Sequence, residues 1–126
     1  LSWAERWGGA FNGLHLICGF QTNAGVDGNN MLKFFAQNMH ANKQTVLDSW
    51  INAALDDQDT GRQAVVMGPL INTQDTTTRD YKSMSATTSG MYRAYWNDHT
   101  WGINGGPGYD VARTGVKGWW RIVVTI

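Results

Sequence analysis

Apolar residues in the first part of the chain recur at helical spacing and then form a short continuous run. The spacing predicts a short helix over residues 3–11, with an apolar face that holds Trp3, Trp7, Ala10 and Phe11. Asn12-Gly13 ends this helix. The run from His15 to Phe20 lacks the alternation of a half-exposed strand, so it predicts a strand covered on both faces, as in a parallel central sheet. The polar residues 21–30 are a predicted loop.

Two amphipathic helices and a second strand follow this loop. The first helix is predicted over residues 31–40, with an apolar face that holds Met31, Leu32, Phe35 and Met39. An apolar stripe over residues 46–55 predicts the second helix, with Asn42 as its candidate N-cap and the Asp-rich segment 56–61 at its end. Residues 63–68 are a predicted buried strand. The order helix, strand, two helices, strand over residues 1–68 indicates the α/β class, with a right-handed parallel crossover.

The second half of the chain, residues 69–126, has a different character. Residues 73–88 are rich in Thr, Ser and Asp and predict a long surface segment. Two strands are predicted here, one over residues 91–96 from its aromatic residues and one over residues 119–126 from its β-branched and aromatic residues. The Gly-rich residues 103–109 predict a loop between them. These late strands are expected to form an antiparallel pair. No linker separates the halves, so residues 1–126 are a predicted single domain.

Composition excludes several classes of protein. The 126 residues include ten Lys+Arg and ten Asp+Glu, and 16% are charged, so the chain lacks the basic excess that nucleic-acid binding needs. No apolar run approaches the roughly 18 residues of a membrane-spanning helix. A single cysteine, Cys18, excludes an internal disulfide framework and a Cys-rich zinc site. Seven Trp and fifteen Gly with little charge favour a secreted or extracellular protein.

One stretch carries a resemblance to a known family: Arg6-Trp7-Gly8-Gly9-Ala10-Phe11-Asn12-Gly13-Leu14-His15-Leu16-Ile17-Cys18-Gly19-Phe20-Gln21-Thr22-Asn23. It resembles the C-terminal part of an uncharacterised microbial family described only as a domain of unknown function. That family is in turn similar to the caspase–gingipain group of cysteine peptidases. The resemblance covers residues 3–68. It implies part of a caspase-like three-layer α/β sheet with helices on both faces, to which the late antiparallel strand pair would be added.

The resemblance also implies where a site would lie. In caspase-like domains the catalytic His and Cys lie on earlier strands, and neither His15 nor Cys18 matches them, so no catalytic residue is expected in this chain. In such peptidases the loop that follows the matched strand lines the substrate pocket. A caspase places a basic residue in this loop to bind an acidic substrate side chain, and residues 21–30 contain no such residue. Its candidate ligand-binding residues are Gln21, Thr22, Asn23 and Asp27. The chain is therefore expected to act as a scaffold for an upstream segment or second chain that carries the catalytic dyad.

Other candidate chemistry is sparse. His15, His40 and His99 have no metal-ligand spacing, and His15 is predicted to be a satisfied histidine of the buried strand. Asp98-His99 is predicted to be a polar turn, with a small hydrolase built on this pair as a minor alternative. The acidic residues 56–59 resemble a calcium loop without its closing Glu and are predicted to be a solvated helix end. No metal and no cofactor is expected.

Aromatic residues gather late in the chain and support a second functional hypothesis. The cluster comprises Tyr92, Tyr95, Trp96, Trp101, Tyr109, Trp119 and Trp120. Successive side chains of a strand point to opposite faces, so one of Trp119 and Trp120 must meet water, a covering helix or a partner. We expect Trp120 inside and Trp119 outward, with Trp101 and Tyr109 beside it at an interface. The chain would then be an extracellular structural or binding module that self-associates into a homo-oligomer through aromatic edge strands.

Overall fold

The computed structural model describes residues 3–22, 30–72, 91–96, 98 and 110–126. The chain forms two compact units, each assembled from separate parts of the sequence. Unit 1 holds Leu1–Ile17, Met67–Trp96 and Gly105–Arg121, and unit 2 holds Cys18–Val66, Asn97–Asn104 and Ile122–Ile126. No helix in the described ranges is long and apolar enough to cross a membrane.

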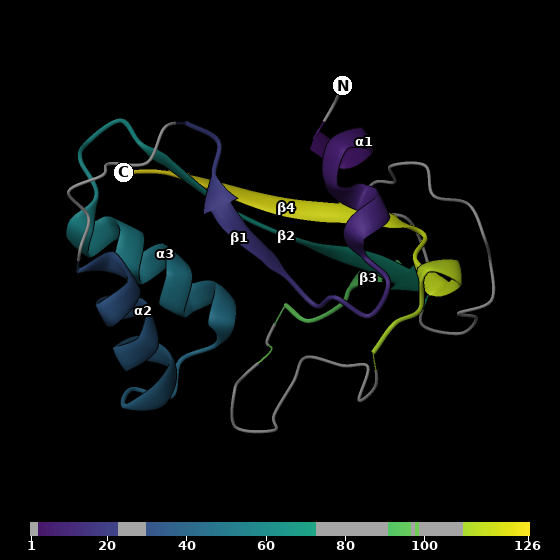
Figure 1. The fold of residues 1–126 in the computed structure, drawn as a ribbon, viewed down its shortest axis with the longest axis horizontal. Coiled ribbons are helices and arrows are strands. Elements are labelled where there is room, and N and C mark those ends of the chain that lie inside the picture. The colour runs from purple at the N-terminus through teal and green to yellow at the C-terminus, as the bar shows by residue number, and fades with distance from the viewer. Residues whose placement is uncertain (1–2, 23–29, 73–90, 97, 99–109) are drawn as a thin grey trace. The chain divides into compact units, whose positions relative to one another are not determined.

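The helices are short, and each unit has its own. Unit 1 holds α1 (Trp3–Trp7) and two 3-10 turns, η1 (Gly8–Ala10) and η2 (Arg113–Gly115). Unit 2 holds α2 (Met31–His40) and α3 (Val46–Asp57), which pack against each other (Figure 1). The predicted helix over residues 31–40 is confirmed, and so is the helix predicted from the apolar stripe over residues 46–55.

The start of α3 differs from the prediction. Its N-cap is Thr45, which has an extended backbone and whose side-chain Oγ1 accepts the Asp48 N–H at 3.0 Å. Asn42, the predicted cap, instead donates its Nδ2–H to Asn38 Oδ1 on α2. Asn42 lies too early because the backbone between the helices needs a further turn, in which Lys43 takes a positive φ of 53°.

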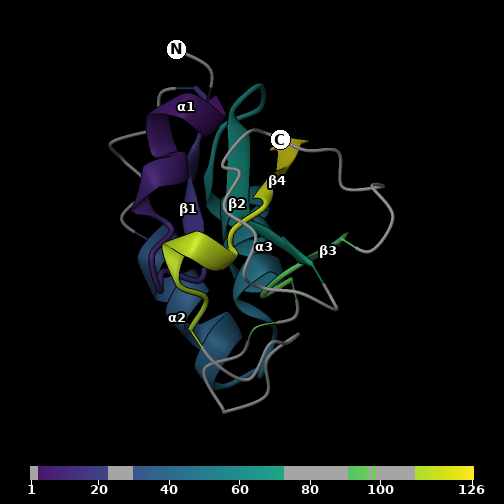
Figure 2. The ribbon, with the colours of Figure 1, turned by 90° about the vertical axis from the view of Figure 1, so that its right-hand side faces the viewer.

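A four-stranded sheet is built around one central strand. Strands β1 (Ile17–Phe20), β3 (Met91–Arg93) and β4 (Gly118–Thr125) all pair with β2 (Gln63–Asn72). The Pro69 carbonyl accepts from Ala94 N and the next carbonyl, of Leu70, accepts from Lys117 N. Successive carbonyls of a strand point to opposite edges, so β3 and β4 lie on opposite edges of β2. Figures 1 and 2 both show β4 running beside β2.

The strand directions correct two expectations. Gln21, directly after β1, donates its N–H to the carbonyl of Gln63, the first residue of β2, so β1 ends where β2 begins and the two are antiparallel. β3 is antiparallel to β2 in the register Leu70↔Arg93. The predicted parallel central sheet is therefore wrong for these strands. The two late strands do pair in antiparallel fashion, but each with β2 rather than with each other, because β2 continues past Gly68 to Asn72.

Trp120 explains how a proline fits inside the central strand. Pro69 has no N–H, so it cannot complete the exchange of hydrogen bonds with Ala94 that an antiparallel pair makes. The Trp120 indole N–H takes that place and donates to the Ala94 carbonyl at 3.1 Å. The ring lies where a Cβ on Gly68 would stand, 2.5 Å from two ring carbons. Gly68 thus makes room for the indole ring, and Pro69 leaves the Ala94 carbonyl free to accept the indole N–H.

Trp119, on the opposite face of β4, is covered from within unit 1. Its indole N–H donates to the Gly8 carbonyl at 3.3 Å, and a Cβ on Gly8 would stand 2.4 Å from the ring. Only 7% of Trp119 is exposed. Its neighbours in the core of unit 1 are Phe11, Met67, Ile71, Ala94, Tyr95, Val111 and Val116. The prediction that Trp119 faces outward is therefore wrong. Instead of meeting water or a partner, its ring is covered by the helical turn η1 of the same unit.

The core of unit 2 lies between its helix pair and the strand residues of that unit. Met31, Ala53, Ala54 and Ala64 are buried there, with Phe20, Phe34, Phe35, Trp50, Ile51 and Ile126 packed against them. The Trp50 indole N–H donates to the Gly19 carbonyl at 3.1 Å, and its ring meets Phe35 edge to face. These contacts fix α3 to the end of β1.

Candidate functional site

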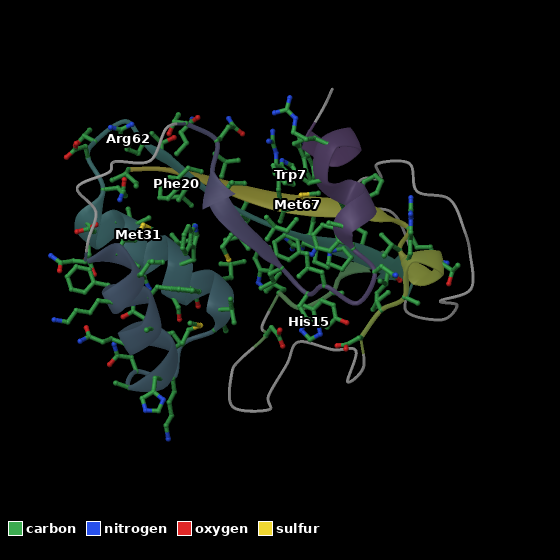
Figure 3. The ribbon with its side chains drawn as sticks, viewed as in Figure 1. Trp7, His15, Phe20, Met31, Arg62 and Met67 are labelled. Atoms are coloured by element: carbon green, nitrogen blue, oxygen red, sulfur yellow. The ribbon has the colours of Figure 1, made fainter. Side chains whose placement is uncertain are left out.

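A partly exposed histidine and a carboxylate form a short polar contact in unit 1. His15 Nε2 lies 2.6 Å from Asp110 Oδ1, and the exposed fractions of the two side chains are 32% and 73%. The imidazole lies flat on the Tyr95 ring, with centroids 3.8 Å apart and planes 4° apart. His15 precedes β1 and lies near the surface (Figure 3). The prediction of a satisfied histidine is confirmed, but its placement on a buried strand is wrong.

Tyr95 supports this contact from inside the core. It is fully buried and its φ of 64° lies in the left-handed region, which an aromatic residue seldom adopts. Such a backbone costs about 1–3 kcal/mol and persists only where its surroundings hold it. Here the Tyr95 hydroxyl accepts the Val111 N–H at 3.0 Å and the ring carries His15.

Asn12 and Gly13 also bond to the segment that holds Asp110. The Gly13 N–H donates to the Val111 carbonyl at 2.9 Å, and Asn12 Oδ1 accepts the Arg113 N–H at 3.0 Å. We call this set, comprising Asn12, Gly13, His15, Tyr95 and residues 110–113, the His15 clamp. It can hold a proton between imidazole and carboxylate, and it fixes the segment 110–113 to the turn before β1.

Two of the four predicted ligand-binding residues lie in the described structure, and both bond to one glutamine. Gln21 donates its N–H to the Gln63 carbonyl at 2.9 Å and its Nε2–H to Gln63 Oε1 at 3.2 Å. Thr22 Oγ1 accepts the Gln63 N–H at 3.0 Å. Asn23 and Asp27 lie outside the described residues.

The polar contacts continue from Gln63 to β4. Gln63 Nε2–H donates to Thr125 Oγ1 at 3.3 Å, so neutral amide and hydroxyl groups from β2, β4 and the residues directly after β1 form one row in unit 2. Gln21, Thr22 and Thr125 are exposed. Such a row can recognise a ligand by hydrogen bonds to neutral polar groups.

The predicted interface aromatics and the Asp98-His99 pair lie largely outside the described residues. Trp101 and Tyr109, predicted to lie at an interface with Trp119, are outside the described residues. So is His99, while the Asp98 carbonyl accepts the Val46 N–H at the start of α3. The acidic segment contains the end of α3, at Asp57, and a turn in which the Asp59 carbonyl accepts the Arg62 N–H.

Metal and thiol chemistry find no support in the described ranges. Across residues 3–22, 30–72, 91–96, 98 and 110–126, no three His, Cys, Asp or Glu side chains come together as a metal site. Burial raises the pKa of the Cys18 thiol to about 11. The thiolate is the nucleophilic form, so Cys18 is unreactive near neutral pH.

Sequence analysis found the loop at Gln21 and Thr22 but missed the His15 clamp. Asp110 lies 95 residues from His15, and nothing near either residue indicates the pairing. The positive φ of Tyr95 also has no sequence signal, since a tyrosine gives no reason to expect it.

Comparison with known proteins gives one match. A family model described as "Domain of unknown function (DUF6345)" matches residues 1–124. The expected resemblance to an uncharacterised domain family is thus confirmed, and it extends well beyond residues 3–68. Searches of curated proteins and of solved structures gave no match.

Proposed function

Because the chain belongs to the DUF6345 family, whose description assigns no activity, we propose its function from its own geometry. We propose that this chain is a non-catalytic scaffold that holds the segment 21–30 as the pocket loop of a larger caspase-like protein. An upstream segment or a second chain would carry the catalytic dyad and complete the fold.

Gln63 supplies the observation that supports this proposal. Its three hydrogen bonds to Gln21 and Thr22 fix the start of the loop to the first residue of β2. At the other end, the Asn30 carbonyl accepts the Phe34 N–H in the first turn of α2. A polar loop anchored on a strand and a helix of one unit is a common setting for ligand binding, because the scaffold positions the loop.

The sheet contributes less to the proposal than the loop does. A strand, a polar loop and two helices in this order agree with the caspase-like resemblance. The antiparallel pairing of β1 with β2 departs from the parallel sheet that the resemblance led us to expect.

The test uses the full natural protein and a library of fluorogenic peptides. If the loop lines a substrate pocket, Asp27→Asn changes kcat/KM for some peptides and leaves thermal stability unchanged. The matched control is Asp56→Asn, the same chemical change at an exposed residue of α3, which should leave hydrolysis unchanged. Absence of peptide hydrolysis by the full protein, or equal kcat/KM in both variants, would overturn the proposal.

A second function is favoured by the position of β4. Among the described strands β4 pairs only with β2, so its other edge has no strand partner in that part of the chain. Arg121 is the only charged residue of its eight, and long edges with little charge are association sites. We propose self-association of two copies through β4 as the alternative function.

Sedimentation of the purified chain tests this alternative. Val123→Lys places a charge on the edge strand and should convert a dimer to a monomer. Leu32→Lys, at a residue of α2 that is 68% exposed, is the matched control and should leave the dimer intact. A wild-type chain that stays monomeric across concentrations contradicts the alternative.

Location outside the cell is a proposal supported by composition alone. The low charge and high Trp and Gly content support it. Fractionation of the source cells with an antibody to the chain tests it, and recovery only from the cytosol would contradict it.

A further inference from the structure

The turn between η1 and β1 contains a chemically labile pair, Asn12-Gly13. In such a pair the glycine backbone nitrogen can attack the side-chain amide carbon of the asparagine. The new N–C bond forms as the C–NH2 bond breaks, and ammonia leaves with the proton of the glycine N–H. Water then opens the five-membered imide to aspartate or isoaspartate. Glycine permits the attack because it has no side chain to hinder the approach.

The structure engages both reacting groups in hydrogen bonds. The attacking nitrogen, Gly13 N, donates to the Val111 carbonyl at 2.9 Å. The side-chain amide under attack is held through Asn12 Oδ1, which accepts the Arg113 N–H at 3.0 Å. Asn12 is exposed, so water can reach the imide once it forms.

These two bonds depend on the rest of the His15 clamp. Val111, which accepts from Gly13, is itself held by the Tyr95 hydroxyl at 3.0 Å, and Asp110 beside it is held by His15 at 2.6 Å. Segment 110–113 must move away before Gly13 N can turn toward the Asn12 side chain. The reaction rate therefore follows the population of the opened clamp.

We propose that Asn12 is a site of spontaneous deamidation that the His15 clamp protects, with opening of the clamp as the controlling step. The product alters the clamp permanently. Isoaspartate adds a methylene to the main chain within the turn, which shifts Gly13 out of register with Val111. Aspartate keeps a side-chain oxygen that can accept the Arg113 N–H but adds a negative charge to the turn. Isoaspartate therefore prevents the original clamp from re-forming, and aspartate changes its charge.

Peptide mass spectrometry after long incubation at neutral pH tests the proposal. Deamidation at Asn12 is followed in the native chain, in the urea-unfolded chain and in Tyr95→Phe. Tyr95→Phe keeps the ring under His15 and removes only the hydroxyl that holds Val111. We expect the native chain to react about tenfold or more slowly than the unfolded chain, and Tyr95→Phe to react several-fold faster than wild type.

Thr45→Ala is the matched control, because it removes the α3 N-cap and destabilises unit 2 without touching the clamp. It should leave the rate at Asn12 unchanged. The proposal is overturned if native and unfolded chains react equally fast, if Asn12 does not react in the unfolded chain, or if Tyr95→Phe reacts no faster than the control. A Tyr95→Phe chain that fails to fold is replaced by Asp110→Asn, which weakens the contact with His15.

Discussion

Replacement of Gly68 by alanine should destabilise the protein through Trp120. The added methyl would stand 2.5 Å from Cε2 and Cζ2 of the ring and 2.7 Å from Nε1. The ring has no room to retreat, since it is 3% exposed and packs on Trp96 with centroids 5.0 Å apart. Overpacking costs about 1–3 kcal/mol. Displacement of the indole from the Ala94 carbonyl adds about 1 kcal/mol. We expect Gly68→Ala to lose about 2–4 kcal/mol, which lowers the Tm by roughly 10 °C in a chain of this size.

Gly19→Ala provides the matched control, since a Cβ on this strand glycine meets nothing within 4 Å. Thermal unfolding followed by circular dichroism should place it within about 1 kcal/mol of wild type. Equal losses in the two variants, or a Tm for Gly68→Ala unchanged from wild type, would refute the reasoning. The cost should also depend on Trp120, so Gly68→Ala combined with Trp120→Leu should lose less than the sum of the single changes.

Three further predictions concern side chains in other parts of the structure. Burial raises the pKa of the Cys18 thiol to about 11, whereas a thiol in the unfolded chain has a pKa of about 8.5. The free energy of unfolding should therefore fall as the pH rises from about 8.5 to about 11, because only the unfolded chain loses this proton over that range. Urea titrations at several pH values should show the fall in wild type and not in Cys18→Ser. Ser49 Oγ is buried and has no hydrogen-bond partner among the residues that the structure describes. Ser49→Ala should therefore be neutral or stabilise by up to about 1 kcal/mol in urea denaturation, and a clear loss would show that the hydroxyl has a partner. Trp119→Ala should cost about 3–5 kcal/mol by the same assay, and an unchanged free energy of unfolding would mean that the ring does not pack on Gly8.

Local pattern was sufficient for elements whose stability is local. The apolar spacing of residues 31–40 and 46–55 predicts α2 and α3, because each helix buries one face. The pattern also predicts a strand over residues 63–68, but it misses the continuation of β2 to Asn72, because Pro69 argues against a central strand. Its tolerance depends on Trp120, a residue distant in sequence that supplies the hydrogen bond proline cannot. No local rule contains that information.

The sites show the same division. A polar, Gly-containing segment after an apolar run identifies the loop at Gln21 and Thr22, although not its anchor, Gln63. Strand alternation correctly separates the faces of Trp119 and Trp120, but the choice of the outward residue failed because Gly8 covers Trp119. The pairing of His15 with Asp110 is a tertiary contact between two surface residues, and neither hydrophobic pattern nor composition predicts such contacts.

The pairing of β4 with β2 also sets the order in which the chain can fold during synthesis. The Ile126 N–H donates to the Arg62 carbonyl, and the Lys117 N–H to that of Leu70. These contacts join residues far apart in the sequence, and such topologies fold slowly. While residues 118–125 are still inside the ribosome, the edge of β2 that later pairs with β4 is uncovered. The Trp119 and Trp120 rings also cannot yet pack on Gly8 and Gly68. A nascent chain at this stage exposes apolar surface of the kind that chaperones bind and that aggregates when synthesis stalls.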